Sequence, residues 1–469
     1  MPLKFVFGPS GSGKSTYLYQ HVIEESEKNP QENFIVLVPE QFTMQTQKDL
    51  VSMHPRHGIM NIDVLSFARL AYRVFEETGA KKLPVLDDEG KNLILRKIAG
   101  DYEDKLTVLK GNIKKLGYIS EVKSVISEFT QYDIGEDEID EMLDTLDEES
   151  RLYYKLKDIQ LLYEGFQDYL RERYITKEEL LDVLSRQVKE SELLKNSVVV
   201  LDGFTGFTPV QNRLMLELMR RCRKVWVTVT MDERENPYSY KHPYQLFGLS
   251  KQMVTTLIKL AREDHIEVEE SVCLYGYPVK RFEKNKELAF LERNIFRYGA
   301  GRYDKAAENL EIHAAGNPRQ EAVAVAEGIR RLVRKEHYRY REIGVIVSDM
   351  NVYGDHLEQA FETYGIPVFM DHKRSILLNS FVEYIRSLLD MAEKNFSYES
   401  VFRFLRTNLA GFTCEEVDEL ENYVIGLGIR GYKGWQNRWI RRLKGMEEEE
   451  LDRLNHYRVQ LVEKVDNLM

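Results

Sequence analysis

The sequence predicts an α/β protein whose parallel sheet is interrupted by a long helical insertion and followed by a second α/β segment. Three observations predict this fold. Short apolar runs alternate with amphipathic helical patterns from the N-terminus onward. A glycine-rich turn joins the first apolar run to the first helical pattern. Residues 86–189 then carry apolar side chains at three- and four-residue spacing, with no strand-like run among them.

The first strands of the sheet are expected from three apolar runs. These runs are Leu3–Phe7, Asn33–Val38 and Ile62–Leu65. Helical patterns follow the first and third runs, at Lys14–Lys28 and Phe67–Thr78, and Ser66 can cap the second helix. Strands and helices in this order indicate parallel strands joined by crossover helices.

The sheet is expected to resume after the insertion. Ser197–Leu201 and Val225–Thr230 are apolar runs, and Val210–Arg221 between them is amphipathic enough to be their crossover helix. Residues 1–85 and 190–290 are therefore assigned to one sheet domain around the insertion.

A polar stretch at about 275–308 predicts a domain boundary, and residues 300–469 are assigned to a second α/β segment. Three strands are expected there, at Leu310–Ala315, Ile343–Val347 and Pro367–Met370. Helices are expected at Arg319–Lys335 and Tyr353–Tyr364, and after Phe381 the pattern is helical, as at the start of another insertion. This pattern reaches the last residue without a terminator, which predicts a fragment of a longer chain.

Composition excludes several classes of protein. Hydrophobic residues make up 43% and charged residues 30%, which is typical of globular proteins. The net charge of -11 excludes a uniformly basic surface but not a local basic site. No apolar run is long enough for a transmembrane helix or for a signal peptide. The scattered cysteines Cys222, Cys273 and Cys414 form no disulfide or metal pattern, so a cytoplasmic location is expected.

The glycine-rich turn matches the phosphate-binding loop G-x-x-x-x-G-K-[ST]. Its residues are Gly8, Pro9, Ser10, Gly11, Ser12, Gly13, Lys14 and Ser15, followed by Thr16. Glycines let main-chain N–H groups surround a phosphate, and the following helix adds its positive end. Lys14 can reach the β- and γ-phosphates, while the Ser15 hydroxyl can bind Mg²⁺. ATP and Mg²⁺ are therefore the predicted ligands of a P-loop NTPase domain of the RecA-like type; the alternative is a glycine-rich turn without a ligand.

The carboxylate expected beside a phosphate loop is Asp202, which follows the run Ser197–Leu201. It completes the predicted nucleotide site and, with Ser15, the predicted Mg²⁺ site; the alternative is a strand-end capping residue. The next residue is Gly203, where efficient ATPases usually carry a glutamate that positions water. Without such a group, hydrolysis is expected to lose about two to four powers of ten.

Four segments resemble the N-terminal part of the AddB family. They are Gly8–Thr16, Val36–Thr43 (VLVPEQFT), Val64–Arg73 (VLSFARLAYR) and Val200–Pro209 (VLDGFTGFTP). AddB proteins are B subunits of ATP-dependent helicase/deoxyribonucleases that process double-strand breaks. The later segments Ala314–Val333, Tyr338–Asp349 and Tyr364–Asp371 resemble domain 2A of UvrD-like superfamily 1 helicases.

The resemblance implies a subunit that binds nucleotide and scans single-stranded DNA for the Chi hotspot, while an AddA-type subunit supplies the motor of the heterodimer. Duplex DNA is the second implied nucleic-acid partner. The family's nuclease domain, its iron–sulfur cysteines and the arginine that completes an ATP site are expected beyond residue 469. No nuclease activity or catalytic residue is therefore assigned to this chain.

The superfamily 1 plan implies that the loops Pro39–Thr43 and Ser66–Arg73 contact single-stranded DNA. The predicted DNA-binding residues are Gln41, Thr43, Phe67, Arg69, Tyr72 and Phe207. The two polar side chains can bond base edges, the three aromatic rings can stack on bases, and the arginine can bond a phosphate or a guanine. The alternatives are a buried helix face for Phe67 and Tyr72 and a structural ion pair for Arg69.

A basic and aromatic cluster at 430–444 is either a DNA contact or, as we favour, a structural element paired with the acidic run Glu447–Glu450. Three hypotheses for function remain at this stage. The first is a DNA-holding, nucleotide-binding repair subunit. The second is a working P-loop enzyme, either a helicase motor or a kinase. The third is a scaffold whose phosphate loop is a relic.

Overall fold

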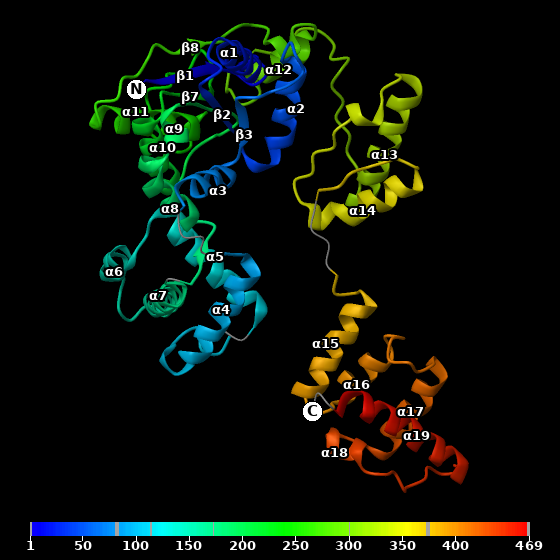
Figure 1. The fold of residues 1–469 in the computed structure, drawn as a ribbon. Coiled ribbons are helices and arrows are strands. Elements are labelled where there is room, and N and C mark those ends of the chain that lie inside the picture. Colours follow the sequence, from blue (N-terminus) through cyan, green and yellow to red (C-terminus); the bar gives the residue numbers. More distant parts are fainter. Residues whose placement is uncertain are drawn as a thin grey trace. The chain divides into compact units, whose positions relative to one another are not determined.

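The computed structural model describes residues 2–79, 84–112, 115–171, 173–299, 301–371 and 376–466. The chain divides into two compact units, Met1–Glu311 and Ile312–Met469, each described by itself (Figure 1).

A six-stranded parallel sheet forms the centre of the first unit, in the order β3-β2-β6-β7-β1-β8. The strands are β1 (Leu3–Gly8), β2 (Asn33–Leu37), β3 (Ile62–Leu65), β6 (Ser197–Leu201), β7 (Lys224–Thr230) and β8 (Val272–Cys273). The register pairs Leu37 with Leu201 and Leu201 with Val227, so the carboxyl ends of three strands meet at one edge. The predicted α/β class with a parallel, RecA-like sheet is confirmed.

Helices cover both faces of this sheet, as expected for strands that are apolar on both sides (Figure 1). α1 (Lys14–Lys28) and α2 (Thr43–Met53) share one core with the sheet. In that core Trp226 of β7 is buried and stacks on His21 of α1, with ring centroids 4.4 Å apart. The other face is covered by α3 (Phe67–Thr78), α8 (Glu179–Gln187), α10 (Pro209–Arg221) and α11 (Gly248–Glu263).

Local capping explains where two of these helices begin. The hydroxyl of Ser66 accepts a hydrogen bond from the main-chain N–H of Arg69, as predicted for the start of α3. Thr208 and Gln211 form a capping box at the start of α10, and Pro209 occupies its first turn. The sequence did not indicate α2, α11 or β8. β8 contains only two residues, too few for an alternating pattern.

The insertion is helical, as expected, and has its own apolar core. Its helices are α4 (Asp88–Asp101), α5 (Leu116–Tyr132), α6 (Glu136–Asp144) and α7 (Arg151–Leu170), followed by α8 and the short α9 (Glu192–Lys195). The expectation that no strand interrupts residues 86–189 was wrong in one detail. β4 (Val85–Leu86) and β5 (Ile175–Thr176) pair in parallel near the two ends of the insertion.

A buried carboxylate organises the loop that follows α4. Asp158 of α7 is 3% exposed and accepts hydrogen bonds from three successive main-chain N–H groups, those of Thr107, Val108 and Leu109, at 2.7–3.1 Å. Both carboxylate oxygens act only as acceptors, so the loop is held by charge-assisted bonds to one side chain.

The second unit begins with α13 (Pro318–Lys335) and α14 (Met350–Thr363), which pack side by side around a small apolar core (Figure 1). The three strands expected near them are absent from the described residues of this unit. Ile343 and Val347 pack against the helix pair, whereas Val345 between them is 42% exposed. Ile346 is fully exposed and no neighbouring segment pairs with this run, so the ladder that defines a strand does not form.

The rest of the second unit is helical, with its own core. Its helices are α15 (Ser380–Glu393), α16 (Tyr398–Leu405), α17 (Cys414–Leu427), α18 (Gly431–Gln436) and α19 (Glu448–Val465). The aromatic half of the cluster at 430–444 is structural: Trp435 and Trp439 are buried. Arg458 donates to the carbonyl of Trp435 at 2.7 Å, and Arg438 pairs with Asp452 at 3.1 Å. In the described part of the chain, no helix combines the length and the apolar character needed to cross a membrane.

Asp158→Asn should destabilise the insertion by about 2 kcal/mol, because an amide NH₂ group would face main-chain donors in a buried site. Urea unfolding followed by circular dichroism would measure this loss. Asp168→Asn is the matched control, since Asp168 lies on the same helix and is exposed. Equal effects of the two substitutions would contradict the structural role of Asp158.

Candidate nucleotide-binding site

The phosphate loop leaves β1 at Gly8 and enters α1 at Lys14. Gly11 and Gly13 have φ angles of +82° and +94°, a left-handed conformation that favours glycine. Gly13 is the N-cap of α1 and no side chain caps the helix, so its first main-chain N–H groups are left for another acceptor. The loop therefore has the backbone of an anion-binding turn.

Lys14 points back into its own loop. Its Nζ donates to the carbonyl oxygens of Gly8 and Pro9, both at 2.9 Å. Burial lowers the pKa of Lys14 to about 8; the positive charge of Arg281 adds to this effect, and the negative charge of Asp202 opposes it. The ammonium group has only neutral partners here, and a charged acceptor would bond it more strongly.

A cavity of about 480 Å³ opens in front of the loop. It is lined by residues from the phosphate loop (Ser10, Gly11, Gly13, Lys14, Ser15, Thr16), from the ends of β6 and β7 (Asp202, Gly203, Phe204, Thr205, Thr228, Thr230) and from a later turn (Lys280, Arg281). The predicted loop residues and Asp202 are thus brought together. Gly8, Pro9 and Ser12 do not line the cavity, and the Ser12 hydroxyl is buried without a hydrogen-bond partner in the described structure.

Asp202 is 7% exposed and two hydroxyl groups hold its carboxylate. Tyr19 of α1 donates to Oδ2 at 2.8 Å, and Thr228 of β7 donates to Oδ1 at 2.6 Å. Burial, with a contribution from the negative charge of Asp202, raises the pKa of Tyr19, so its phenol stays protonated and remains a donor. Neither Tyr19 nor Thr228 was among the predicted site residues, since each is an ordinary member of a helix or strand in sequence.

The backbone conformation explains why a glycine follows Asp202. Gly203 has a φ angle of +81°, and a Cβ there would lie 3.6 Å from the ring of Pro39. A glutamate at this position would adopt a strained backbone. The absence of the usual glutamate therefore follows from the path of this loop.

Two cations that sequence analysis missed come from the turn Lys280–Phe282, which follows β8. The main-chain N–H of Arg281 donates to the carbonyl of Gly11 at 3.0 Å, which docks the turn on the phosphate loop. Among the described residues, no carboxylate forms an ion pair with Lys280 or Arg281. An arginine for this site was expected only beyond residue 469, and the structure places Arg281 beside the loop.

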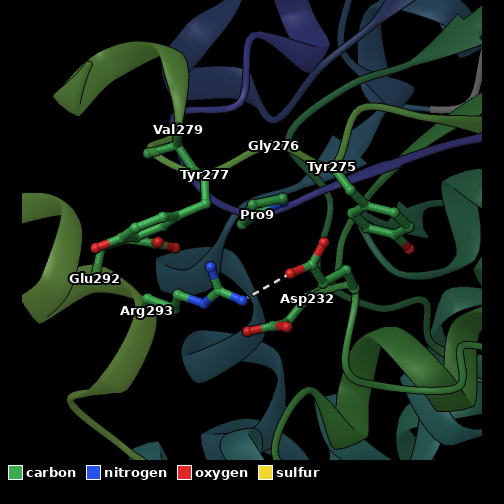
Figure 2. Close-up of a pocket in the computed structure, with 9 residues that line it drawn as sticks. Pro9, Asp232, Tyr275, Gly276, Tyr277, Val279, Glu292 and Arg293 are labelled. Carbon is green, nitrogen blue, oxygen red and sulfur yellow. Dashed lines mark hydrogen bonds and ion pairs between the residues drawn. The ribbon is translucent and has the colours of Figure 1, made fainter. Parts of the chain in front are cut away.

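The segment that carries these cations is anchored behind the loop, against Pro9 (Figure 2). Arg293 of α12 (Lys286–Asn294) lies over the ring of Tyr277 at 4.5 Å and donates to Glu233 at 2.8 Å. The pocket between these groups measures about 20 Å³, enough for about one water molecule. Packing among these groups fixes the position of the turn that carries Lys280 and Arg281.

The predicted DNA residues follow the carboxyl ends of three strands. Gln41 and Thr43 come after β2, Phe67, Arg69 and Tyr72 lie on α3 after β3, and Phe207 comes after β6. Gln41 is exposed in the short turn Glu40–Phe42. Thr43 is buried and donates to the carbonyl of Glu40 at 3.0 Å. Phe42, which was not predicted, is 48% exposed and offers the stacking face that this loop was expected to have.

The other candidates divide between exposed and packed side chains. Arg69 is exposed, with its Nε 3.7 Å from Glu40, and Tyr72 is 48% exposed. Phe67 is buried, with ring centroids 5.2 Å from Phe204 and 6.3 Å from Phe207. Phe67 is therefore a packing residue in this structure, as the alternative hypothesis had it, and base stacking on Phe67 or Phe207 stays a prediction.

A comparison with protein families gives a match over residues 5–292 to the family described as "ADDB, N-terminal". This chain belongs to the AddB N-terminal family. It is 44% identical over 98% of its length to the B subunit of the ATP-dependent helicase/deoxyribonuclease of Lachnoclostridium phytofermentans. The proteins of the same name from Caldanaerobacter subterraneus subsp. tengcongensis and Clostridium novyi are 36% and 32% identical over 94% and 99% of the chain. The chain spans 38–40% of the length of these three relatives.

In this AddB-family loop, Gly11→Ala should destabilise the first unit more than Gly79→Ala does. Both glycines have a positive φ angle, so both substitutions introduce backbone strain of about 1–3 kcal/mol. A Cβ on Gly11 would also lie 2.8 Å from Cβ of Arg281, whereas a Cβ on Gly79 would meet nothing within 4 Å. Urea unfolding of both variants would test this difference. Equal losses of unfolding free energy would show that a side chain at position 11 makes no steric clash with Arg281.

Proposed function

We propose that the first unit binds Mg²⁺-ATP at the phosphate loop and holds single-stranded DNA on the loops after β2 and β3. In this proposal it is the N-terminal part of a subunit that acts in repair of DNA double-strand breaks. One observation carries the nucleotide part. Lys14, Lys280 and Arg281 surround one cavity with the uncapped end of α1, and Asp202 lies at its edge.

These residues fit a magnesium–triphosphate ligand. Lys14 would exchange two neutral carbonyl acceptors for charged oxygens, and Lys280 and Arg281 would add positive charge beside Gly11 and Gly13. The Ser15 hydroxyl and the Asp202 carboxylate supply the hard oxygen ligands that Mg²⁺ prefers. When bound, ATP would supply the phosphates that order this loop.

We infer that binding at this site is stronger than turnover. Asp202 is the single carboxylate among the described residues that line the cavity, and Tyr19 and Thr228 already hold both of its oxygens. Gly203 offers no base to orient water. The presence of Arg281 favours a second candidate, an active ATPase, because an arginine beside the phosphates can stabilise transition-state charge. Steady-state turnover separates the two: several turnovers per second by this chain would support the second candidate.

The DNA part of the proposal rests on exposed side chains at the carboxyl edge of the sheet. The amide of Gln41 can donate to and accept from base edges. Phe42 and Tyr72 supply two rings on which bases can stack, and Arg69 supplies a cation. These are the functions that a groove reading single-stranded DNA requires, and they support scanning for a hotspot sequence such as Chi.

The names of the relatives support the partner. Each relative is named as the B subunit of a helicase/deoxyribonuclease, so we propose an AddA-type companion subunit that supplies the motor. Duplex DNA would be the substrate of the complex, and the cytoplasm its compartment. The iron–sulfur cluster and the nuclease metal belong in this proposal to sequence beyond residue 469.

Lys14→Ala should abolish binding of Mg²⁺-ATP, as measured by calorimetric titration, while leaving the thermal unfolding midpoint nearly unchanged. Binding by the natural sequence should also weaken roughly tenfold between pH 7 and pH 9, because the lowered pKa of about 8 leaves Lys14 mostly neutral at the higher pH. Affinity for ATP falls as pH rises because the charged form of Lys14 binds phosphate, and this form is lost at higher pH.

Lys28→Ala is the matched control, since Lys28 ends the same helix and is exposed. It should bind ATP like the natural sequence. Absence of ATP binding by the natural sequence would favour the scaffold hypothesis, with the loop as a relic. Binding that is independent of pH would contradict the role given to Lys14.

Glu40→Gln should raise affinity for single-stranded DNA several-fold. Glu40 accepts a hydrogen bond from Ser66 at 3.0 Å and lies beside Arg69, so its charge repels phosphate and competes for the arginine. Fluorescence anisotropy with a labelled oligonucleotide at several salt concentrations would measure the gain, with a steeper salt dependence as Arg69 becomes available. Glu263→Gln, an exposed change on α11, controls for net charge, and an equal gain there would refute the local effect.

A further inference from the structure

A buried chain of three polar side chains crosses the core between the nucleotide site and the first DNA loop. Thr46 of α2, Tyr19 of α1 and Asp202 after β6 are each less than 9% exposed. The Tyr19 oxygen lies 3.3 Å from the Thr46 hydroxyl and 2.8 Å from Asp202 Oδ2. The surrounding core is apolar, so these groups have few alternative partners.

The direction of these hydrogen bonds follows from counting protons. A phenol has one proton, and Asp202 can only accept, so Tyr19 donates to Asp202. The Tyr19 oxygen must then accept from Thr46, whose hydroxyl proton is thereby held away from its own helix. The chain runs as donor to acceptor from Thr46 through Tyr19 to Asp202.

Thr46 lies in the first turn of a helix that continues directly from the DNA loop. The turn Glu40–Phe42 carries Gln41 and Phe42, and α2 begins at Thr43. Four residues before Thr46 is Phe42, whose carbonyl is the usual acceptor for a helical threonine that bonds within its own helix. A hydrogen bond from Thr46 to this carbonyl would therefore tie the helix to the end of the loop that presents the exposed Phe42 ring.

We propose that Tyr19 couples the nucleotide site to the DNA loop through its hydroxyl group. This inference rests on the proposed function. Asp202 would lose Oδ2 as an acceptor for Tyr19 if that oxygen held a cation, and the Tyr19 hydroxyl would then turn its proton toward Thr46. The Thr46 hydroxyl would in turn donate to the carbonyl of Phe42, and the first turn of α2 would shift together with the loop before it. Occupancy of the two sites is thereby linked in both directions.

Ser26 provides the contrast. It lies on α1 like Tyr19 and is 3% exposed, and its hydroxyl donates to the carbonyl of Ile23 in the same helix at 2.8 Å. Loss of this hydroxyl removes a buried polar group from α1 and leaves the hydrogen bonds of Asp202 and Thr46 intact. Ser26→Ala is therefore the matched control for loss of a buried hydroxyl on α1.

The test measures DNA affinity of the chain by fluorescence anisotropy, using a labelled single-stranded oligonucleotide with and without saturating Mg²⁺ and a non-hydrolysable ATP analogue. Binding of the analogue is measured separately by calorimetry. The natural sequence should show at least a fivefold change in DNA affinity on adding nucleotide. Tyr19→Phe and Thr46→Val should reduce this change to less than twofold, and Ser26→Ala should retain it.

Retention of the full change in Tyr19→Phe or Thr46→Val would overturn the coupling, as would its loss in Ser26→Ala or its absence from the natural sequence. If the natural sequence binds no analogue, the proposed function itself fails, and the coupling fails with it. If it binds both ligands independently, only the coupling fails. Tyr19→Phe and Thr46→Val each remove one buried hydroxyl group, so thermal unfolding of each variant is measured to check that it is folded.

Discussion

The position of β6 between β2 and β7 is the constraint on which the site depends. Because all strands of the sheet run parallel, their carboxyl ends share one edge, and neighbours in the sheet need not be neighbours in sequence. The chain returns after a long helical insertion to place Asp202 between the loop that follows β2 and the end of β7. The phosphate loop follows β1, the next strand along, so groups far apart in sequence share one cavity.

The electrostatics of this edge are opposite in sign to those of the whole chain. The net charge is -11, yet the cavity contains three cationic side chains and one carboxylate among its described lining residues. Two of the cations are held in place by the anchored segment behind Pro9, where Arg293 lies over Tyr277. Local field, set by which loops meet at the sheet edge, decides what this site attracts.

Sequence patterns predicted elements whose signals are local. The bounds of α1 and α3 are as expected because a glycine loop and Ser66 fix their starts. Sequence analysis did not predict Lys280 and Arg281 as site residues. They reach the site only because their turn packs against Gly11, which is far away in sequence. Gly203 was noted as a departure, but its positive φ angle is visible only in the structure. The apolar run Ile343–Val347 has no strand partner among the described residues, because pairing depends on segments that are distant in sequence.

The tryptophans are divided between the two units. Trp226 is the single one in the first unit, stacked on His21 and lying 4.9 Å below the ammonium group of Lys4, whereas Trp435 and Trp439 pack together in the second. Indole fluorescence is sensitive to its immediate surroundings, so emission from the chain is the sum of a signal from each unit. Replacing both indoles of the second unit would leave one intrinsic reporter inside the core that joins α1 to the sheet, without attaching any dye.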